Sequence, residues 1–263
     1  MRGGLAPPRS ASARPKFAVA RRAHSLSAVN VPVIDAEHLP QGEEKAQAVR
    51  AMFDAIAPRY DLVNRIMTLR MDVGWRRRTV RTLRLPGGAT VVDLACGTGD
   101  LCRELSSAAY RPIGMDLSFG MLRAARTEAP LVHADALRLP LRDASVDGIT
   151  CGFALRNFVD LSPFLDELAR VVRPGGRIAL LEVAEPPNPL LRWGHGIYFG
   201  KVVPRIGALL SDGAAYRYLP KSVAYLPPPD ELVALVRRAG FADGERTLLS
   251  TGIAQLLTGT RDP

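Results

Sequence analysis

Hydrophobic positions along the chain recur first at the spacing of a helix and then at the spacing of buried strands. From Glu43 onward, apolar residues repeat every three or four positions, which predicts helical structure to about residue 85 with a break at Pro58. After Pro86-Gly87-Gly88, short apolar runs begin, and the first, at 90–95, predicts a buried strand. Later runs end at Met115, His133, Gly152 and Val183, and helical patterns fill 100–107, 119–128 and 161–172.

The regular alternation of strand and helix predicts the fold class. Strands joined by helices pair in parallel through right-handed crossovers, so the pattern favours an α/β fold with an open, doubly wound, mostly parallel sheet. A last helix at 230–239 and two apolar runs at 246–250 and 253–260 close the chain. We expect a tail at 1–42, one folded domain at 43–263, a helical cap at 43–85 and an inserted segment at 186–229.

Composition narrows the class of protein. The 263 residues are 47% hydrophobic and 23% charged, which suits one complete core and is too apolar for a disordered chain. No uncharged apolar run approaches the roughly 18 to 20 residues of a membrane-spanning helix. The three cysteines lack metal-ligand spacing and suit a reducing compartment, so neither a metal site nor a disulfide framework is expected.

Most of the net charge of +9 comes from the N-terminal tail. Residues 1–34 hold six basic residues and no acid, so the folded part is close to neutral and no nucleic-acid partner is expected. The tail is rich in Arg, Ser, Ala and Pro, the composition of a mitochondrial or plastid transit peptide. We favour the alternative, a disordered tail or an early start codon, because Pro7, Pro8 and Pro15 oppose a regular helix.

The clearest chemical signal is the string DLACGTGD at 93–100, which joins the first strand to a helix. Gly97 and Gly99 allow a tight turn that brings a ligand against bare backbone, next to the unpaired N–H groups of the helix N-terminus. Asp116 ends the second strand and Asp135 follows the third, so both carboxylates lie where the strand order reverses. An acid after the second strand is placed to bind two ribose hydroxyls. Together these features predict an adenosine-type ligand.

The loop also excludes two kinds of adenosine ligand. A dinucleotide-binding loop carries a third glycine where this chain has Cys102. The GxGK loop that binds nucleoside triphosphates is missing as well. Neither a nicotinamide dinucleotide nor a nucleoside triphosphate is therefore favoured.

Four strings, DLACGTGDL, GMDLSFGML, ADALRLPLRDASVDGIT and RVVRPGGRIALLE, resemble class I S-adenosylmethionine-dependent methyltransferases. More narrowly, MFDAIAPRYDLVNRIMTL with the following WRR, GFALRNFVD and AYRYLPKSVAYLP resemble the quinone C-methyltransferases of menaquinone and ubiquinone biosynthesis, over residues 49–260. The resemblance implies a seven-stranded Rossmann-like sheet with an N-terminal helical cap, S-adenosyl-L-methionine as cofactor and an isoprenoid quinol as substrate. The implied reaction methylates a ring carbon, with demethylmenaquinol as the favoured acceptor. A C- or O-methyltransferase of a soluble phenol and a non-catalytic subunit of a quinone-biosynthesis complex are the alternatives.

The chain departs from this family at several positions. Ala95 and Cys96 stand where the family usually has two glycines before GTG, and Ala154 stands where it has a glycine before the L-R-N string. A glutamate is usual near Lys221, and a histidine is usual in the C-terminal strand where Gln255-Leu256-Leu257 sits. The cofactor half of the motifs is intact, so these changes bear on the identity of the acceptor.

The resemblance also implies a cofactor site. Asp116 is expected to accept from both ribose hydroxyls and Asp135 to face the adenine amino group, with a turn cap as the alternative for Asp135. Asp93 lies inside the first strand, where an unpaired carboxylate is costly, so we expect it to accept backbone N–H groups of the turn or to approach the methionine ammonium through water. The whole expected set is Asp93, Gly97, Thr98, Gly99, Asp116, Asp135, Ala136 and Gly152.

Methyl transfer to a ring carbon needs alignment and an electron-rich ring whose neighbouring oxygen has lost its proton. Arg156 is the expected stabiliser of that oxygen because its guanidinium stays charged, and Asn157 is expected to hold the other oxygen. Tyr60 and Asp61, on the helical cap, are expected to handle protons, Asp61 through water. The structural alternatives are a helix cap at Tyr60-Asp61 and a salt bridge from Arg156 to Asp160 or Asp166.

Residues 193–211 form a broad apolar stretch with basic flanks. A core-packing helix explains the pattern, and the alternatives are a groove for a polyprenyl tail and a contact with a bilayer surface. We interpret His133 and His195 as structural and the cysteines as packing residues. Peripheral membrane contact, a homodimer and a cytoplasmic place on the inner face of the membrane are expectations, with an organelle as the alternative location.

Overall fold

The structure is a computed structural model that describes residues 42–198, 200, 203, 205 and 222–263. The expected tail therefore lies outside the described residues except for Gly42, and so does part of the insertion expected at 186–229. The described strands are β1 (Thr90–Leu94), β2 (Arg111–Asp116), β3 (Leu131–His133), β4 (Val146–Gly152), β5 (Val172–Val183), β6 (Glu245–Leu249) and β7 (Ala254–Thr260).

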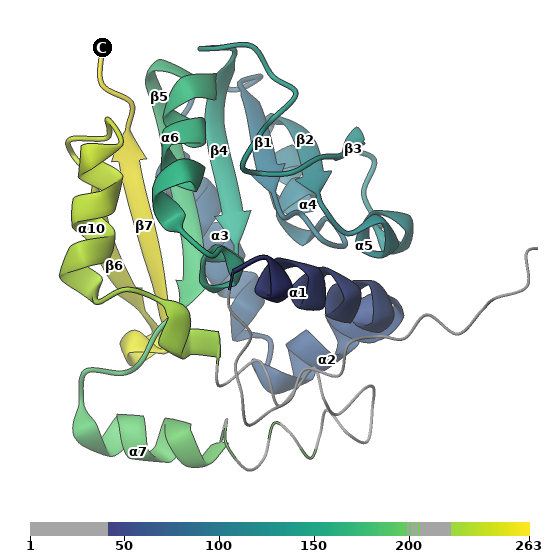
Figure 1. Ribbon diagram of the computed structural model, residues 1–263, viewed down its shortest axis with the longest axis vertical. Coiled ribbons are helices and arrows are strands. Elements are labelled where there is room, and N and C mark those ends of the chain that lie inside the picture. The colour runs from purple at the N-terminus through teal and green to yellow at the C-terminus, as the bar shows by residue number, and fades with distance from the viewer. Residues whose placement is uncertain (1–41, 199, 201–202, 204, 206–221) are drawn as a thin grey trace, which may run out of the picture. The chain divides into compact units, whose positions relative to one another are not determined.

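These strands form a seven-stranded sheet in the order β3-β2-β1-β4-β5-β7-β6 (Figure 1). β1 pairs in parallel with both β2 and β4, β2 with β3, and β4 with β5. β7 pairs antiparallel with both β5 and β6. The expected doubly wound, mostly parallel sheet is confirmed, and its order reverses between β1 and β4.

Helices cover both faces of the sheet. α3 and α4 lie behind it and α6 and α10 lie in front of it in the view of Figure 1. The described helices are α1 (Gly42–Ile56), η1 (Ala57–Arg59), α2 (Tyr60–Met67), α3 (Met71–Leu83), α4 (Asp100–Ser107), α5 (Phe119–Ala124), η2 (Leu155–Asn157), α6 (Leu161–Val171), α7 (Pro189–Ile197), η4 (Val223–Tyr225), α10 (Pro229–Arg238) and η5 (Ser250–Gly252).

Alternate residues of each strand enter the cores on opposite faces. In β5, Leu180 packs in the cluster that contains Phe164 of α6. Its neighbour Leu181 packs in the cluster that contains Trp75 of α3 and Leu101 of α4. Because both faces are covered, the strands read as continuous apolar runs rather than as alternating ones.

The helical stretch expected as a cap divides into two parts. α1 and α2 form a small core of their own, in which Val49, Met52 and Ile56 meet Val63 and Met67. α3 belongs instead to the layer behind the sheet, where its buried residues pack against β1 and β5. Only α1, η1 and α2 are therefore free to act as a cap over the sheet edge.

Two boundaries differ from the sequence expectation. α5 ends at Ala124 rather than at 128, because the Arg126 N–H donates to the Thr98 carbonyl at 3.0 Å and draws the chain onto the glycine loop. β5 begins at Val172, the last residue of the expected helical pattern, and runs through Arg173-Pro174-Gly175-Gly176 with a register shift against β4. Among the described helices, none has both the length and the apolar character needed to cross a bilayer.

Ala95, directly after β1, has a φ of +49°, in the left-handed region that glycine prefers. We expect Ala95→Gly to raise the free energy of unfolding by about 0.5–1 kcal/mol, because relief of the side-chain strain exceeds the entropy that glycine adds to the unfolded chain. Chemical denaturation of both forms measures the difference.

The matched control is Ala55→Gly, at an exposed position inside α1. There the substitution should lower the free energy of unfolding by about 1 kcal/mol, since glycine is a poor helix former. A loss of stability of similar size at Ala95 would contradict the strain argument.

Candidate functional site

A cavity of about 210 Å³ lies at the carboxyl ends of β1, β2 and β4. This is the edge where the strand order reverses, the usual ligand site of a doubly wound sheet. Residues of α1 and Tyr60 of α2 complete its wall. The cavity is lined by seven of the residues expected to bind the cofactor, namely Asp93, Gly97, Thr98, Asp116, Asp135, Ala136 and Gly152.

Gly99 is the member of the expected set that does not line this cavity. Its φ is +83°, and a Cβ at this position would come within 2.6 Å of the Thr127 side chain. Glycine is therefore required for the turn and for the close approach of the segment after α5. Gly99 thus shapes the loop, and its contact with a ligand stays a prediction.

Asp116 ties the glycine loop to the second strand. Its Oδ2 accepts the Gly97 N–H at 2.7 Å, and its Oδ1 accepts the Ser118 N–H at 2.8 Å. Each oxygen keeps a further lone pair, which is what two ribose hydroxyls require. Burial raises the pKa of Asp116, while the two N–H groups oppose the shift.

Asp135 caps its own turn, since its Oδ1 accepts the Leu137 N–H at 2.9 Å. This is the structural alternative weighed for the residue. The side chain is exposed and lines the cavity, and its Oδ2 binds none of the described residues. The cap therefore leaves one carboxylate oxygen for a ligand.

Asp93 is fully buried at the cavity floor. It accepts the Thr150 hydroxyl at 2.8 Å and the Cys102 thiol at 3.6 Å. The expectation that backbone N–H groups of the turn hold it is wrong, because side chains from β4 and α4 do so. Burial raises the pKa of Asp93 to about 7, so its charge changes near neutral pH.

Helix α1 is fastened beside the cavity at both of its ends. Near its C-terminus, Asp54 accepts the Ser118 hydroxyl at 2.5 Å. Near its N-terminus, Lys45 donates to the Phe158 carbonyl at 2.8 Å and lies 3.6 Å from the centre of the Tyr225 ring. Burial lowers the pKa of Lys45 to about 8. These contacts hold the helix against the loops after β2 and η2.

A second cavity of about 210 Å³ adjoins the first, and Tyr60 and Phe153 line both. Phe153 follows β4 with a φ of +61°, a strained conformation for a bulky residue. Its ring centre is 6.3 Å from that of Trp75. Tyr60 and Phe153 are the two residues that line both cavities, and we call this pair the partition.

Arg156 lines the second cavity and is 5% exposed. Its ion-pair partner is neither Asp160 nor Asp166 but Glu182 of β5, which is fully buried. Its Nη1 also donates to the Phe153 carbonyl at 2.8 Å, and its Nε donates to the Ser222 hydroxyl at 3.0 Å. Within the described part of the chain, Nη2 has no hydrogen-bond partner.

The other expected catalytic residues lie in three different places. Asn157 lines the first cavity, so it and Arg156 face different cavities. Tyr60 is in the partition, and burial raises the pKa of its hydroxyl. Asp61 lines neither cavity, and its carboxylate accepts the Thr98 hydroxyl beside a separate cleft. Proton handling by Asp61 does not fit this placement, so we assign it the positioning of Thr98.

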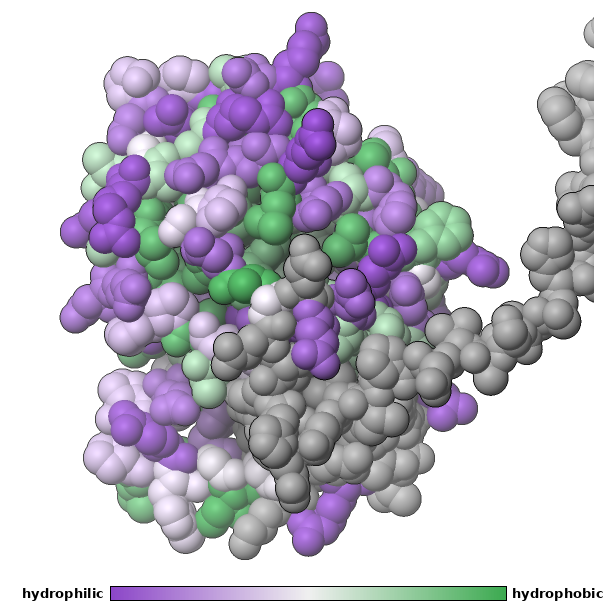
Figure 2. Space-filling view, in the orientation of Figure 1, coloured by the Kyte–Doolittle hydropathy of each residue, from purple (hydrophilic) through white to green (hydrophobic). Residues whose placement is uncertain are grey.

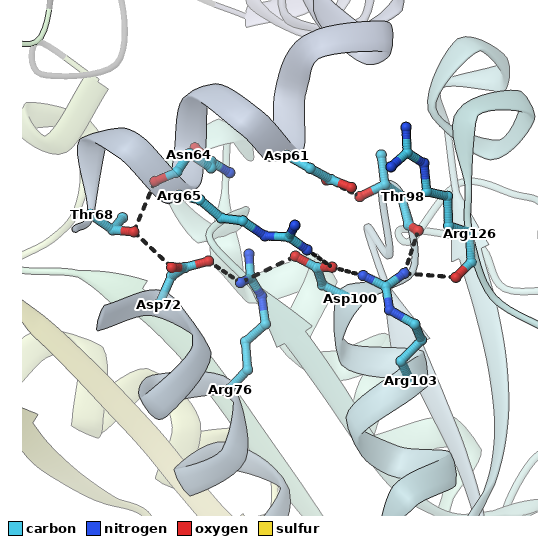
Figure 3. A network of polar contacts seen from close by, with 10 residues as sticks. All are labelled: Asp61, Asn64, Arg65, Thr68, Asp72, Arg76, Thr98, Asp100, Arg103 and Arg126. Carbon is cyan, nitrogen blue, oxygen red and sulfur yellow. Dashed lines mark hydrogen bonds and ion pairs between the residues drawn. The ribbon is translucent and has the colours of Figure 1, made fainter. Parts of the chain in front are cut away.

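A network of charged side chains joins α2 and α3 to the start of α4 (Figure 3). Arg76 lies between two carboxylates, and its Nη1 pairs with Asp72 and, at 3.2 Å, with Asp100. Asp100 also pairs with Arg103 and, at 3.7 Å, with Arg65. The network therefore surrounds the first residue of the helix that follows the glycine turn.

Sequence reasoning missed Glu182, Phe153 and Arg76. Glu182 carries a usable signal, since a single acid inside the apolar run IALLEV of a strand buried on both faces needs a buried partner. Arg76 and Phe153 lie in the WRR and GFALRNFVD strings, but nothing in those strings singles them out, because their importance comes from contacts between separate helices and from backbone strain.

The two histidines differ in their surroundings. His133 Nε2 is 2.9 Å from the Leu117 carbonyl, and its ring packs edge-on against Phe119, which fits the expected structural role. His195 lines the second cavity, and burial lowers its pKa. The three cysteines are buried, as packing residues are.

Sequence comparison places the chain among methyltransferases. The ubiE/COQ5 methyltransferase family matches residues 41–261. A demethylmenaquinone methyltransferase of Roseiflexus castenholzii is 44% identical over 233 residues, 85% of this chain and 97% of the relative. A demethylmenaquinone methyltransferase of Deinococcus radiodurans is 43% identical over 83% of this chain and 95% of its own length. The ubiquinone/menaquinone biosynthesis C-methyltransferase UbiE of Syntrophotalea carbinolica is 41% identical over 82% and 94%.

Solved structures of methyltransferases share the fold. A SAM-dependent methyltransferase of Thermotoga maritima has a TM-score of 0.56 at 21% identity, covering 80% of this chain and 100% of that chain. Phosphoethanolamine N-methyltransferase 2 of Haemonchus contortus, in complex with S-adenosyl-L-methionine, has a TM-score of 0.53 at 12% identity over 72% and 52%. At these identities the likeness concerns the arrangement of strands and helices.

The raised pKa of Asp93 predicts how cofactor binding depends on pH. Between pH 6 and pH 8 the carboxyl passes through its pKa of about 7, and the ammonium group of S-adenosylhomocysteine favours the ionised form. Affinity of the wild-type protein for this ligand should therefore rise about tenfold from pH 6 to pH 8. In Asp93→Asn the affinity should not show this rise. Isothermal titration calorimetry at both pH values measures the change, with Asp143→Asn, an exposed position, as the control.

The same pKa has the opposite effect on the free protein. The native state holds the Asp93 proton more tightly than the unfolded chain, whose reference pKa is 3.8, so stability falls as pH rises between about 4 and 7. Asp93→Asn should flatten that part of the stability profile. An equal slope in both proteins would show that Asp93 is ionised throughout.

Proposed function

Because the chain belongs to the ubiE/COQ5 methyltransferase family, and is thus an S-adenosylmethionine-dependent C-methyltransferase of quinone biosynthesis, we propose that its acceptor is a demethylated isoprenoid quinol, demethylmenaquinol. The observation that carries the proposal is the pair of adjoining cavities, one lined by the cofactor motifs and one by Arg156. A donor and an aromatic acceptor can meet at the partition.

The residues of the first cavity suit the cofactor. Asp116 has acceptor capacity for the ribose hydroxyls, Asp135 has a carboxylate oxygen for the adenine amino group, and Asp93 can ionise beside an ammonium group. S-adenosylmethionine supplies a methyl group on a sulfonium, which makes that carbon electrophilic. The protein must align this carbon with the acceptor and keep water out.

Arg156 is proposed to stabilise the deprotonated oxygen of the quinol ring. Its guanidinium is held by Glu182, Ser222 and the Phe153 carbonyl, so its orientation is fixed before the acceptor arrives. Its Nη2 has no described partner and can donate to that oxygen. A fixed donor beside a developing phenolate makes the adjacent ring carbon nucleophilic.

Two further side chains can manage protons at the second cavity. The raised pKa of Tyr60 keeps its hydroxyl protonated, so it donates a hydrogen bond rather than acting as a base. The reaction replaces a ring hydrogen by a methyl group, so one proton must leave. His195 is interpreted from the sequence as structural, but it lines the second cavity, and burial lowers its pKa. We therefore propose instead that its neutral ring accepts that proton.

Exposed apolar side chains near the second cavity support a contact with the membrane that holds the quinone. On α2 and in the turn after it, Leu62 is 55% and Leu69 is 71% exposed, and on α7 Leu190 is 73% and Trp193 is 68% exposed. Figure 2 shows separate hydrophobic areas among pale and hydrophilic ones over α7. We propose a peripheral contact with the cytoplasmic face of the membrane through these helices, which leaves the isoprenoid tail in the bilayer. A homodimer and the absence of a nucleic-acid partner remain predictions.

The acceptor is tested by incubating the purified chain with methyl-labelled S-adenosylmethionine and reduced membrane extract that contains demethylated quinones. Label on a ring carbon of the quinone fraction, located by mass spectrometry, is the expected result. Label confined to water-soluble phenols would replace the quinol by the alternative acceptor class. No transfer to either fraction would contradict the proposal.

Arg156→Ala is expected to lower kcat by about 10²- to 10³-fold, the usual cost of losing one fixed donor at a developing oxyanion. Affinity for S-adenosylhomocysteine should change less than threefold, because Arg156 does not line the first cavity. Arg156→Lys keeps the positive charge of the site and serves as a second variant in case Arg156→Ala does not fold.

Arg173→Ala is the matched control. Arg173 pairs with Asp147 near the start of β5, whereas Glu182, the partner of Arg156, lies near the end of that strand. It should leave both parameters unchanged. A large loss of cofactor affinity in Arg156→Ala would contradict the division of roles between the two cavities.

A further inference from the structure

Arg76 has hydrogen-bonding capacity that the protein does not use. It lines the first cavity and is 7% exposed. Its Nη1 makes both of its ion pairs, whereas Nε and Nη2 donate to none of the described residues. Neither of these nitrogens is sealed from solvent. One edge of a nearly buried guanidinium therefore remains for something in the cavity, and leaving it unbonded is costly.

The position of Arg76 identifies the end of the ligand that it meets. Asp116 and Asp135 mark the adenosine end of the cavity. Arg76 lies at the partition, where its guanidinium carbon is 5.7 Å from the centre of the Phe153 ring. The reacting carbon of the cofactor must face this partition, so the amino-acid half of the cofactor lies near Arg76.

The charge of the surrounding network favours a carboxylate. Two acids, Asp72 and Asp100, face three arginines, Arg65, Arg76 and Arg103. One positive charge is left over, and the edge formed by Nε and Nη2 matches the two oxygens of a carboxylate. Arg50 also lines the cavity, but its side chain is exposed on α1.

We infer that Arg76 binds the α-carboxylate of the methionine half of S-adenosylmethionine and so selects donors that carry it. Asp72 and Asp100 hold the guanidinium in place through Nη1, and the other edge receives the ligand. Arg76 was not among the residues expected from the sequence. The inference rests on the proposed function for its cofactor and is independent of the acceptor.

The test compares S-adenosylmethionine with decarboxylated S-adenosylmethionine, which keeps the adenosine, the sulfonium and the ammonium group. Calorimetry on the full chain should give a preference for the carboxylated ligand on the order of 10- to 100-fold, the usual gain from a charge-assisted bidentate pair. In Arg76→Gln that preference should fall below about threefold. Affinity for the decarboxylated ligand should stay within about threefold of wild type.

Arg77→Gln is the matched control, because Arg77 is the neighbour of Arg76 in α3, pairs with Glu104 outside the network and does not line the cavity. It should keep the wild-type preference. Removing Arg76 leaves Asp72 without its cation, whereas Asp100 keeps Arg65 and Arg103. Asp72→Asn with Arg76→Gln therefore provides a second variant that carries one fewer negative charge.

Several outcomes would overturn the inference. One is equal affinity of the wild-type chain for the two ligands, and another is a wild-type preference retained in both Arg76 variants. A third is equal weakening of both ligands in these variants, which would give Arg76 a structural role only. Because no acceptor is present, failure to methylate a quinol leaves this result unaffected, so the two proposals fail separately.

Discussion

The site depends on keeping two arginines charged inside the protein, one on each side of the partition. Arg76 is held by Asp72 and Asp100, and Arg156 is held by Glu182. Burying such pairs costs desolvation energy, and removing one partner typically costs about 3–5 kcal/mol because a charge is left uncompensated. The two apolar cores of the sheet must offset this cost. In return, both guanidiniums keep a fixed orientation, which flexible surface arginines lack, while Nη2 of Arg156 and Nε and Nη2 of Arg76 donate to none of the described residues.

The cap, formed by α1, η1 and α2, connects the glycine loop and the loop after β2 to the second cavity. Asp54 accepts the Ser118 hydroxyl, and the Ser118 N–H donates to Asp116, so α1 is connected through one intermediate residue to the carboxylate expected to bind the ribose. Asp61 makes a similar connection from α2 to the glycine loop through Thr98. The same α2 contributes Tyr60 to the second cavity. Movement of the cap would therefore disturb both cavities together, which couples the order of the loops around the first cavity to the shape of the second.

The sequence predicted those parts of the protein that follow from local pattern. Apolar runs and their spacing determine strands and helices, and parallel pairing brings Asp93, Asp116 and Asp135 to one edge. The pattern says nothing of partners distant in the chain, which is why the pairing of Arg156 with Glu182 was unforeseen. It also places adjacent residues together by default, although the 3₁₀ turn of η2 sends Arg156 and Asn157 to different cavities.

The distribution of charge agrees with the chemistry of methyl transfer. Among the described residues, the first cavity is lined by four carboxylates and two guanidiniums, so it favours a cationic sulfonium over the neutral thioether that remains after transfer. Product binding is thereby weakened relative to cofactor binding. In the role proposed for Arg156, an arginine without an acidic partner would hold the phenolate too strongly and repel the sulfonium. Glu182 reduces the field of Arg156, so in that role the arginine would orient the oxygen and leave the ring carbon reactive.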